Sequence, residues 1–246
     1  GRCGLRMNLL LLHPEQLVTP ERARVTGRQL EHLHQVHGAD TGDSLRVGLR
    51  DGAMGTGRIE HLDTQEAILA LALDEAPPAP LPLTLVLALP RPKMLRRIIQ
   101  SIVSMGVKHL VLVNSYRVEK SYWQTPWLQP ESLSEQITLG LEQGRDTGWP
   151  TIVQRNRFKP FVEDELAAIT TGSRRLIAHP GSGGACPLGL DEPVSLCIGP
   201  EGGFIPYEVE LIREQGFHPV HLGARILRTE TFVPAVLGRL FDISNG

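Results

Sequence analysis

The spacing of apolar residues changes character once along the chain. In the first part, apolar and polar positions alternate over 45–49 and 57–59, on either side of a turn-forming segment at 50–52. Alternation of this kind is typical of strands with one buried face, and the segment between them is a hairpin signal. Residues 27–36 have helical spacing, and 65–73 form another apolar run. This part is therefore predicted to be a small β-barrel.

A proline-rich segment separates this part from the rest. Residues 76–82 read Ala-Pro-Pro-Ala-Pro-Leu-Pro, a composition that favours an extended, semi-rigid spacer. We therefore predict a β-barrel domain at 7–75, a linker at 76–82 and a second domain at 83–246.

After the linker, short apolar runs alternate with segments of helical spacing. Strands are predicted at 83–89, 109–113, 151–154, 175–178, 194–198 and 220–222. Helices are predicted at 94–105, 132–142, 162–169, 207–215 and 232–241. This alternation indicates an α/β domain with a parallel sheet, in which ligands bind beyond the carboxyl ends of the strands. Three loops follow strands there, at 179–184, 199–204 and 223–231.

Composition is compatible with this two-part organisation. The chain has 246 residues, 41% of them hydrophobic, which suffices for one large domain or a moderate and a small one. No apolar run approaches the roughly 20 residues that a membrane-spanning helix needs. We interpret residues 1–6 as an extension. Cys3, Cys186 and Cys197 have no disulfide or zinc spacing, which favours a cytoplasmic protein, and Cys197 is expected in the core.

The net charge of −2 is not that of a globally basic nucleic-acid binder. Of the 25 basic residues, however, 4 are Lys and 21 are Arg. Arg suits planar contacts to phosphates and bases, although a codon bias would give the same excess. His32, His34 and His37 are interpreted as solvated positions, because no carboxylate or Cys accompanies them as a metal ligand.

The loops favour a cofactor other than a nucleoside triphosphate or dinucleotide. The chain has neither a phosphate-binding Gly-Lys-Ser/Thr loop nor a Gly-x-Gly-x-x-Gly turn. The glycines of Gly199-Pro200-Glu201-Gly202-Gly203 permit close backbone approach to a flat ligand, or simply a tight turn before a helix. Residues 228–231, Arg-Thr-Glu-Thr, place charges and hydroxyls at the start of the last helix, with Thr231 as its expected N-cap.

Together, 198–204 (Ile-Gly-Pro-Glu-Gly-Gly-Phe) and 222–231 (Leu-Gly-Ala-Arg-Ile-Leu-Arg-Thr-Glu-Thr) resemble motifs of a known family. They are similar to the SPOUT class of S-adenosylmethionine-dependent RNA methyltransferases, and within it to the bacterial family that makes 3-methyluridine in 16S ribosomal RNA. Weaker similarity extends over nearly the whole chain from Met7. The first domain resembles a PUA-like barrel.

The resemblance implies an α/β fold with a C-terminal trefoil knot, a homodimer and S-adenosylmethionine as cofactor, without a metal. It implies a cytoplasmic enzyme that methylates N3 of a uridine in the small ribosomal subunit. Cofactor contacts are then expected at His179, Ile198, Gly199, Pro200, Gly202, Gly203, Leu222, Gly223, Ile226, Leu227, Arg228 and Thr231.

Methylation at N3 requires loss of the N3 proton or stabilisation of the charge that develops. Glu230 and Glu201 are the candidate bases, with Glu230 preferred because Glu201 can cap its own loop. Arg228 is the candidate for stabilising the anionic uracil, or alternatively for clamping a phosphate. RNA contacts are predicted at Arg22, Arg24, Arg28, Arg46, Arg91 and Lys93, each of which could instead be a solvated surface position.

The chain departs from the family pattern at several positions, which are Ser101, Ser104, Gly38, Pro180 and Phe232. These departures leave open a non-catalytic RNA-binding or ribosome-assembly protein that keeps the fold. A ribose 2′-O-methyltransferase of the same class is a second alternative, for which Asn114 is the available Asn.

Overall fold

The computed structural model describes residues 8–35 and 39–245, which form two compact units. The first unit extends to Ala79 and also takes in Thr138–Trp149, while the second comprises Pro80–Ile137 and the chain from Pro150 onward. The predictions that concern residues 1–6, His37 and Gly38 lie outside the described residues.

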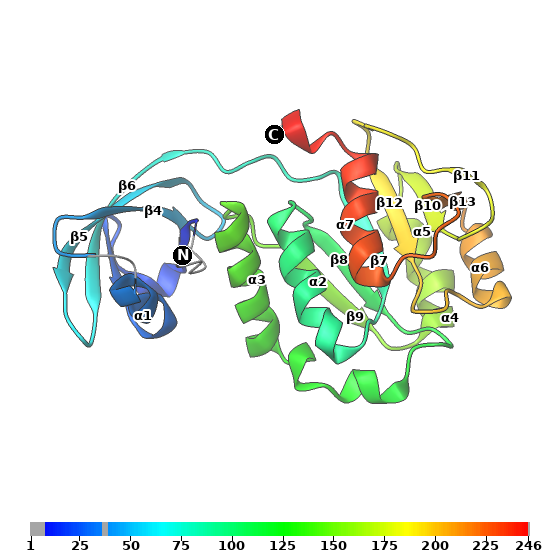
Figure 1. The fold of residues 1–246 in the computed structure, drawn as a ribbon, viewed down its shortest axis with the longest axis horizontal. Coiled ribbons are helices and arrows are strands. Elements are labelled where there is room, and N and C mark those ends of the chain that lie inside the picture. Colours follow the sequence, from blue (N-terminus) through cyan, green and yellow to red (C-terminus); the bar gives the residue numbers. More distant parts are fainter. Residues whose placement is uncertain (1–7, 36–38, 246) are drawn as a thin grey trace. The chain divides into compact units, whose positions relative to one another are not determined.

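The first unit is built on a sheet with the strand order β1-β4-β5-β6-β3-β2. Its strands are β1 (Leu10–Leu12), β2 (Leu17–Thr19), β3 (Arg22–Val25), β4 (Ser44–Leu49), β5 (Met54–Leu62) and β6 (Ala67–Glu75). The pairs are antiparallel except β1 with β4. The sheet curls over helix α1 (Gly27–Gln35), whose Leu30 and Leu33 complete a core with inward-facing strand residues (Figure 1).

The predicted hairpin turn lies between β4 and β5. Asp51 has a φ of 59°, and the Gly52 amide donates to the Leu49 carbonyl at 2.7 Å. Asp tolerates this left-handed conformation, which most side chains avoid. The alternating pattern thus identified both the strands and the turn between them.

A distant segment completes the first unit through Glu142, near the end of α3 (Pro130–Gly144). The Glu142 carboxylate is 2% exposed and accepts hydrogen bonds from the Leu11 amide at 3.0 Å, Gln29 Nε2 at 3.3 Å and Arg28 Nη2 at 2.8 Å. Burial raises the pKa of Glu142, and Arg28 opposes that shift. Sequence reasoning did not anticipate that part of this helix belongs with the β-rich unit.

The second unit is a seven-stranded, wholly parallel sheet with the order β11-β13-β10-β12-β7-β8-β9. Its strands are β7 (Leu83–Ala88), β8 (His109–Val113), β9 (Thr151–Arg155), β10 (Arg174–Ala178), β11 (Gly184–Ala185), β12 (Val194–Ile198) and β13 (His218–His221). The short β11 was not predicted. Strands β7 and β12 are almost entirely buried, as expected for a central pair covered on both faces.

Helices cover this sheet. They are α2 (Pro92–Ser104), the start of α3, α4 (Phe158–Phe161), α5 (Ala167–Ile169), α6 (Pro206–Arg213) and α7 (Thr229–Leu240). The predicted helix at 162–169 proves to be one irregular helix from 158 to 169, with a π-helical centre at Val162–Leu166. Helix α2 packs against α7. Short 3-10 turns complete the chain at Pro14–Gln16, Lys120–Gln124 (η2), Pro126–Leu128 and Ile243–Asn245.

The end of α7 lies against the segment that joins β10 to β12. The amides of Gly189 and Leu190 donate to the carbonyls of Arg239 and Leu240 at 2.9 and 2.6 Å, and Arg239 Nε donates to the Cys186 carbonyl at 2.7 Å. The last helix is therefore tied to a segment of chain that precedes β12.

Candidate active site

The first candidate loop, 198–204, follows the central strand β12 and is shaped by its glycines. A Cβ atom on Gly199 would lie 2.8 Å from the amide nitrogen of Phe204 and 3.2 Å from the carbonyl carbon of Gly203. Gly202 and Gly203 have φ values of 84° and 83°, in the left-handed region that side chains avoid. The turn therefore requires glycine at Gly199 for space and at the other two positions for conformation.

This glycine loop is held from outside by Arg117, which the sequence analysis did not single out. Its Nη1 donates to the carbonyl oxygen of Gly202 and to that of Gly203, the latter at 3.3 Å. Two successive left-handed residues present their carbonyls to the same guanidinium. Arg117 comes from the segment after β8, so only the tertiary structure reveals this contact.

The second loop, 222–228, follows β13 and is open to solvent. Gly223 has a φ of 104°, and a Cβ atom there would meet no atom within 4 Å. Ile226 is 92% exposed. An apolar side chain presented in this way beside open space fits a loop that a ligand or a partner covers.

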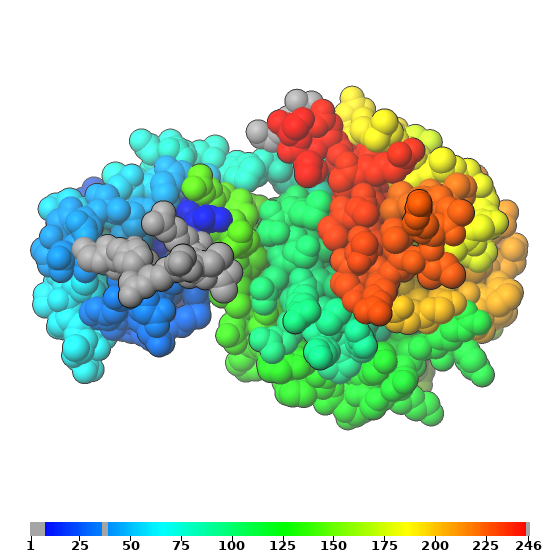
Figure 2. Space-filling view, viewed as in Figure 1, coloured from blue at the N-terminus to red at the C-terminus, as the bar shows by residue number. Residues whose placement is uncertain are grey.

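The third loop begins at His179, at the end of β10. The His179 amide donates to the Val220 carbonyl of β13 at 3.0 Å. Because β10 lies between β12 and β13 in a parallel sheet, the three loops all leave the sheet at the carboxyl ends of its strands. The structure therefore brings the predicted cofactor residues of all three loops to one end of the second unit, and α7 with its preceding loop lies on the surface (Figure 2).

The first two loops meet through Glu201 and the start of α7. Glu201 Oε1 accepts from the amide and the hydroxyl of Thr229 at 3.5 and 3.4 Å. The helix begins at Thr229, so the prediction that Thr231 is its N-cap was wrong. Arg228 occupies that position without a side-chain cap. The carboxylate of Glu201, from another loop, supplies the negative charge that a helix N-terminus favours.

A small cavity of about 40 Å³ lies where these loops meet the end of β7. Within the described chain, the Glu230 Oε2 atom is buried and has no hydrogen-bond partner. A buried carboxylate oxygen without a donor is costly, so it marks a position where a donor from a ligand would be favourable. The cavity is lined by Ala88, Leu89, Pro90, Arg91, Met94, Arg117, Tyr122, Pro200, Glu201, Thr229 and Glu230.

Arg228, the predicted stabilising residue, does not line this cavity. Its side chain is exposed, and its carbonyl accepts from the amides of Thr231 and Phe232 at 3.0 and 2.8 Å. The arginines that do line the cavity are Arg91 and Arg117. Arg91 was predicted as an RNA contact, whereas Arg117 was missed because nothing in its local sequence marks it.

The predicted RNA-binding arginines of the first unit are all paired with carboxylates. Arg28 pairs with the buried Glu142. The other pairs are Arg22 with Glu60, Arg24 with Glu66, and Arg46 with Glu75. Each carboxylate already neutralises part of the positive charge that a phosphate would use.

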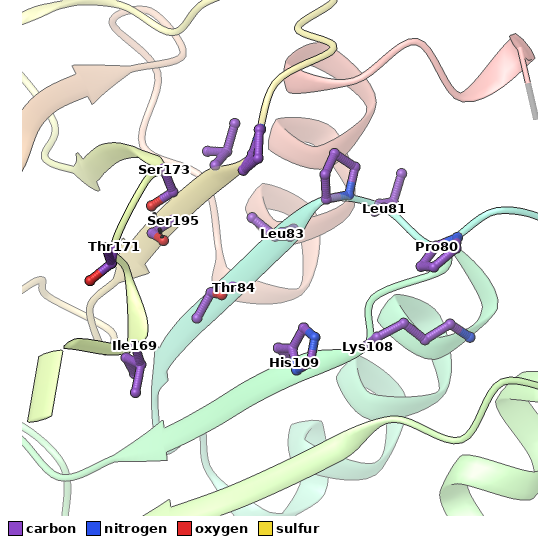
Figure 3. A pocket seen from close by; sticks show the side chains of 13 residues that line it. Pro80, Leu81, Leu83, Thr84, Lys108, His109, Ile169, Thr171, Ser173 and Ser195 are labelled. Atoms are coloured by element: carbon purple, nitrogen blue, oxygen red, sulfur yellow. Dashed lines mark hydrogen bonds between the residues drawn. The ribbon is translucent and has the colours of Figure 1, made fainter. Parts of the chain in front are cut away.

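A larger cavity of about 410 Å³ lies at the amino-terminal ends of the strands in the sheet of the second unit (Figure 3). Thr84, His109 and Ser195 line it near the amino-terminal ends of their strands. The Ser195 hydroxyl shares a hydrogen bond of 2.7 Å with that of Ser173. None of the predicted site residues lines this cavity.

Among residues 8–35 and 39–245, no group of three His, Cys, Asp or Glu side chains is arranged to hold a metal ion. The helices of the same residues include none that is long and apolar enough to cross a membrane.

Comparison with known proteins identifies similar chains over the same regions. Residues 77–240 match the RNA methyltransferase domain family. The chain is 28% identical to ribosomal RNA small subunit methyltransferase E of Treponema pallidum, over 81% of this chain and 77% of that protein. It is 27% identical to the protein of the same name from Synechocystis sp., over 94% of this chain and 76% of that protein.

The solved structure of ribosomal RNA small subunit methyltransferase E from Neisseria gonorrhoeae, bound to S-adenosylmethionine, is similar to nearly the whole chain. It superposes with a TM-score of 0.72 at 22% identity, over 94% of this chain and 95% of that one. This likeness confirms the predicted fold class.

Proposed function

Because this chain belongs to the RNA methyltransferase domain family, and within it to the ribosomal RNA small subunit methyltransferase E family, we propose that it methylates N3 of a uridine in 16S ribosomal RNA. The methyl donor is S-adenosylmethionine, and the RNA is the substrate within the small ribosomal subunit. The observation that carries the proposal is Glu230, which lines the cavity where the two motif loops meet and has a buried oxygen without a hydrogen-bond partner.

The three loops offer a site that fits the cofactor. Open space beside Gly223 and the exposed Ile226 leave room and apolar surface, and the left-handed glycines at 202 and 203 allow close backbone approach. When bound, S-adenosylmethionine supplies an electrophilic methyl group. The residues that would hold it are His179, Ile198, Gly199, Pro200, Gly202, Gly203, Leu222, Gly223, Ile226, Leu227, Arg228 and Thr231.

The chain's own contribution to the chemistry is proton removal. Uridine N3 carries a proton and is a poor nucleophile until that proton is lost. Glu230 has a buried oxygen without a donor, whereas Glu201 already accepts two hydrogen bonds from Thr229. This difference supports Glu230 as the base and Glu201 as the residue that positions the start of α7.

Positive charge near the base would stabilise the uracil anion. Arg228, exposed at the N-cap of α7, remains the residue proposed for this role, with Arg91 and Arg117 lining the cavity. Replacing Arg228 with Ala and measuring cofactor affinity separately from turnover distinguishes catalysis from binding. Turnover equal to that of the unaltered protein removes Arg228 from the catalytic role.

Mass mapping of 16S ribosomal RNA nucleosides, with and without the protein, tests the function directly. We expect one uridine to gain a methyl group at N3 in the presence of protein and cofactor. A product methylated on the ribose, or no product, contradicts the proposal.

One observation and one measurement bear on the alternatives. The Asn114 amide donates to the Asn156 carbonyl at 3.1 Å, and its oxygen accepts from Trp123 Nε1 at 3.0 Å, so it is already engaged in structural contacts. A non-catalytic assembly protein is distinguished by calorimetry with S-adenosylmethionine, which would then show no binding.

The family also motivates a homodimer as part of the proposal. Leu188 and Ile226, on segments next to α7, are 71% and 92% exposed, which a second subunit would cover. Light scattering at micromolar concentration is expected to give twice the mass of the chain. A monomeric mass would remove the dimer from the proposal without affecting the methyl transfer.

A further inference from the structure

The segment after β8, 114–119, is fixed against the glycine loop and α6. The Tyr116 amide donates to Glu208 Oε2 at 2.9 Å, while Glu208 Oε1 accepts from the Ile205 amide at 3.0 Å. Glu208 is 3% exposed, so its buried carboxylate links the two segments by accepting a hydrogen bond from each. Arg117 adds the contacts to the Gly202 and Gly203 carbonyls.

This rigid segment presents an aromatic ring to solvent. Tyr116 is 79% exposed, although its backbone is held by a buried carboxylate. Tyr207, in the first turn of α6 and adjacent to Glu208, is 54% exposed. Among the Phe, Tyr and Trp residues that the structure describes, these are the two exposed ones, and both follow or precede segments that contact the glycine loop.

Exposed aromatic rings on a fixed backbone are suited to stacking on unpaired bases. A tyrosine offers a large flat surface at a small cost in conformational entropy, and base stacking on such rings is a main source of affinity for single-stranded RNA. Arg117, which is also exposed, places a positive charge in the same segment. The chemistry of this surface therefore fits a nucleic acid strand better than a purely apolar partner.

We propose that Tyr116 and Tyr207 form a stacking surface for the unpaired RNA bases that flank the target uridine. The inference rests on the proposed function, because it assumes that the target base enters between the glycine loop and α7. The surface is continuous with that site through Arg117, which lines the cavity and also contacts Gly202 and Gly203.

Fluorescence anisotropy with a short labelled single-stranded RNA that contains a central uridine tests this surface. We expect Tyr116→Ala and Tyr207→Ala each to weaken binding by about tenfold, from the loss of one stacked base. Tyr116→Phe and Tyr207→Phe are the matched controls, since they keep the ring and lose only the hydroxyl, and they should bind within about twofold of the unaltered protein.

The same RNA with abasic nucleotides on either side of the uridine sharpens the test. It should bind the unaltered protein more weakly, and it should show little further loss with the Ala variants, because the stacking partner is already absent. Equal binding by the Ala and the unaltered proteins overturns the inference, as does an equal loss in the Phe and Ala variants.

Two further measurements distinguish an RNA-stacking surface from a subunit interface and from a part of the cofactor site. Light scattering identifies a subunit interface, so a changed oligomeric state in the Ala variants overturns the proposal in favour of a second copy of the chain. Calorimetry with S-adenosylmethionine should give unchanged affinity in all four variants.

If the unaltered protein methylates 16S ribosomal RNA but the Ala variants bind RNA normally, only the stacking surface fails. If the unaltered protein neither methylates nor binds RNA, the proposed function fails with it.

Discussion

At the scale of single residues, two carboxylates share one cavity but have different surroundings. Glu201 Oε1 accepts two hydrogen bonds from Thr229 at the start of α7, whereas Glu230 Oε2 is buried without a donor. A general base must be free to accept a proton from the substrate, so this difference supports the proposal that Glu230, rather than Glu201, is the base.

Glu230→Gln should lower turnover by about a hundredfold or more, since the amide keeps the shape of the side chain but cannot take a proton. Affinity for S-adenosylmethionine, measured by calorimetry, should stay close to that of the unaltered protein. Glu201→Gln should instead affect cofactor affinity and thermal stability together, because it weakens the contact between the two loops. A Glu230→Gln protein with full turnover would exclude Glu230 as the base.

A second residue-scale prediction concerns Asp63, in the turn between β5 and β6. The amide of Glu66, then His61 and the amide of Gln65, donate hydrogen bonds to this carboxylate and lower its pKa to about 2. Its ordinary pKa is 3.8. A lowered folded-state pKa adds stability above the ordinary value, and that stability is lost as the pH falls towards 2.

Nuclear magnetic resonance titration should therefore show the Asp63 carboxyl protonating near pH 2. In Asp63→Asn, the part of the acid destabilisation that falls between pH 3.8 and 2 should become smaller, as measured by urea unfolding at each pH. A titration midpoint at the ordinary value would contradict the hydrogen-bonded turn.

At the scale of elements, the glycine loop depends on space as well as on backbone freedom. The Cβ position of Gly199 is 2.8 Å from a backbone nitrogen, which cannot move aside as a flexible side chain could. The loop therefore has one tightly constrained glycine at its start, two conformationally required glycines at 202 and 203, and an external clamp in Arg117.

Gly199→Ala should weaken S-adenosylmethionine binding by about tenfold, because the loop must shift its backbone to make room for the Cβ atom of the alanine. Gly238→Ala is a matched control, since its added Cβ meets no atom within 4 Å and its position in α7 favours Ala. Calorimetry should show normal affinity for the control. If both variants bind S-adenosylmethionine with similar affinity, the glycine loop does not form part of the cofactor site.

At the scale of the whole molecule, the basic residues that were predicted to bind RNA differ in whether a carboxylate already pairs with them. The four arginines of the first unit that were predicted to bind RNA are paired with carboxylates. For Arg91 and Lys93, at the start of α2, the structure shows no such pair among the residues it describes. The two groups should therefore contribute differently to the salt dependence of RNA binding.

Binding to the small ribosomal subunit should weaken as salt is added. Arg91→Gln and Lys93→Gln should each reduce the slope of log affinity against log salt by about one, the effect of losing one phosphate contact. Arg22→Gln should reduce it less, because Glu60 already neutralises that guanidinium. Binding that is independent of salt would remove the phosphate contacts from the proposal altogether.

Most of the secondary structure could be predicted because hydrophobic periodicity follows from which face of an element is buried. The strands at 109–113 and 194–198 were predicted with the observed bounds. The start of α7 was misjudged by three residues, since Thr231 is a good N-cap in isolation, whereas Glu201 from another loop caps the helix at Thr229.

The sequence by itself determined the two motif loops, the glycines in them and the parallel α/β organisation. These features depend on local backbone conformation and on short-range patterns of burial. Only the tertiary structure showed that Arg117 holds the glycine loop, that Glu142 completes the β-rich unit and that Glu230 has a buried oxygen without a donor. Such contacts join residues more than eighty positions apart or depend on the absence of a neighbour, and no local pattern encodes either.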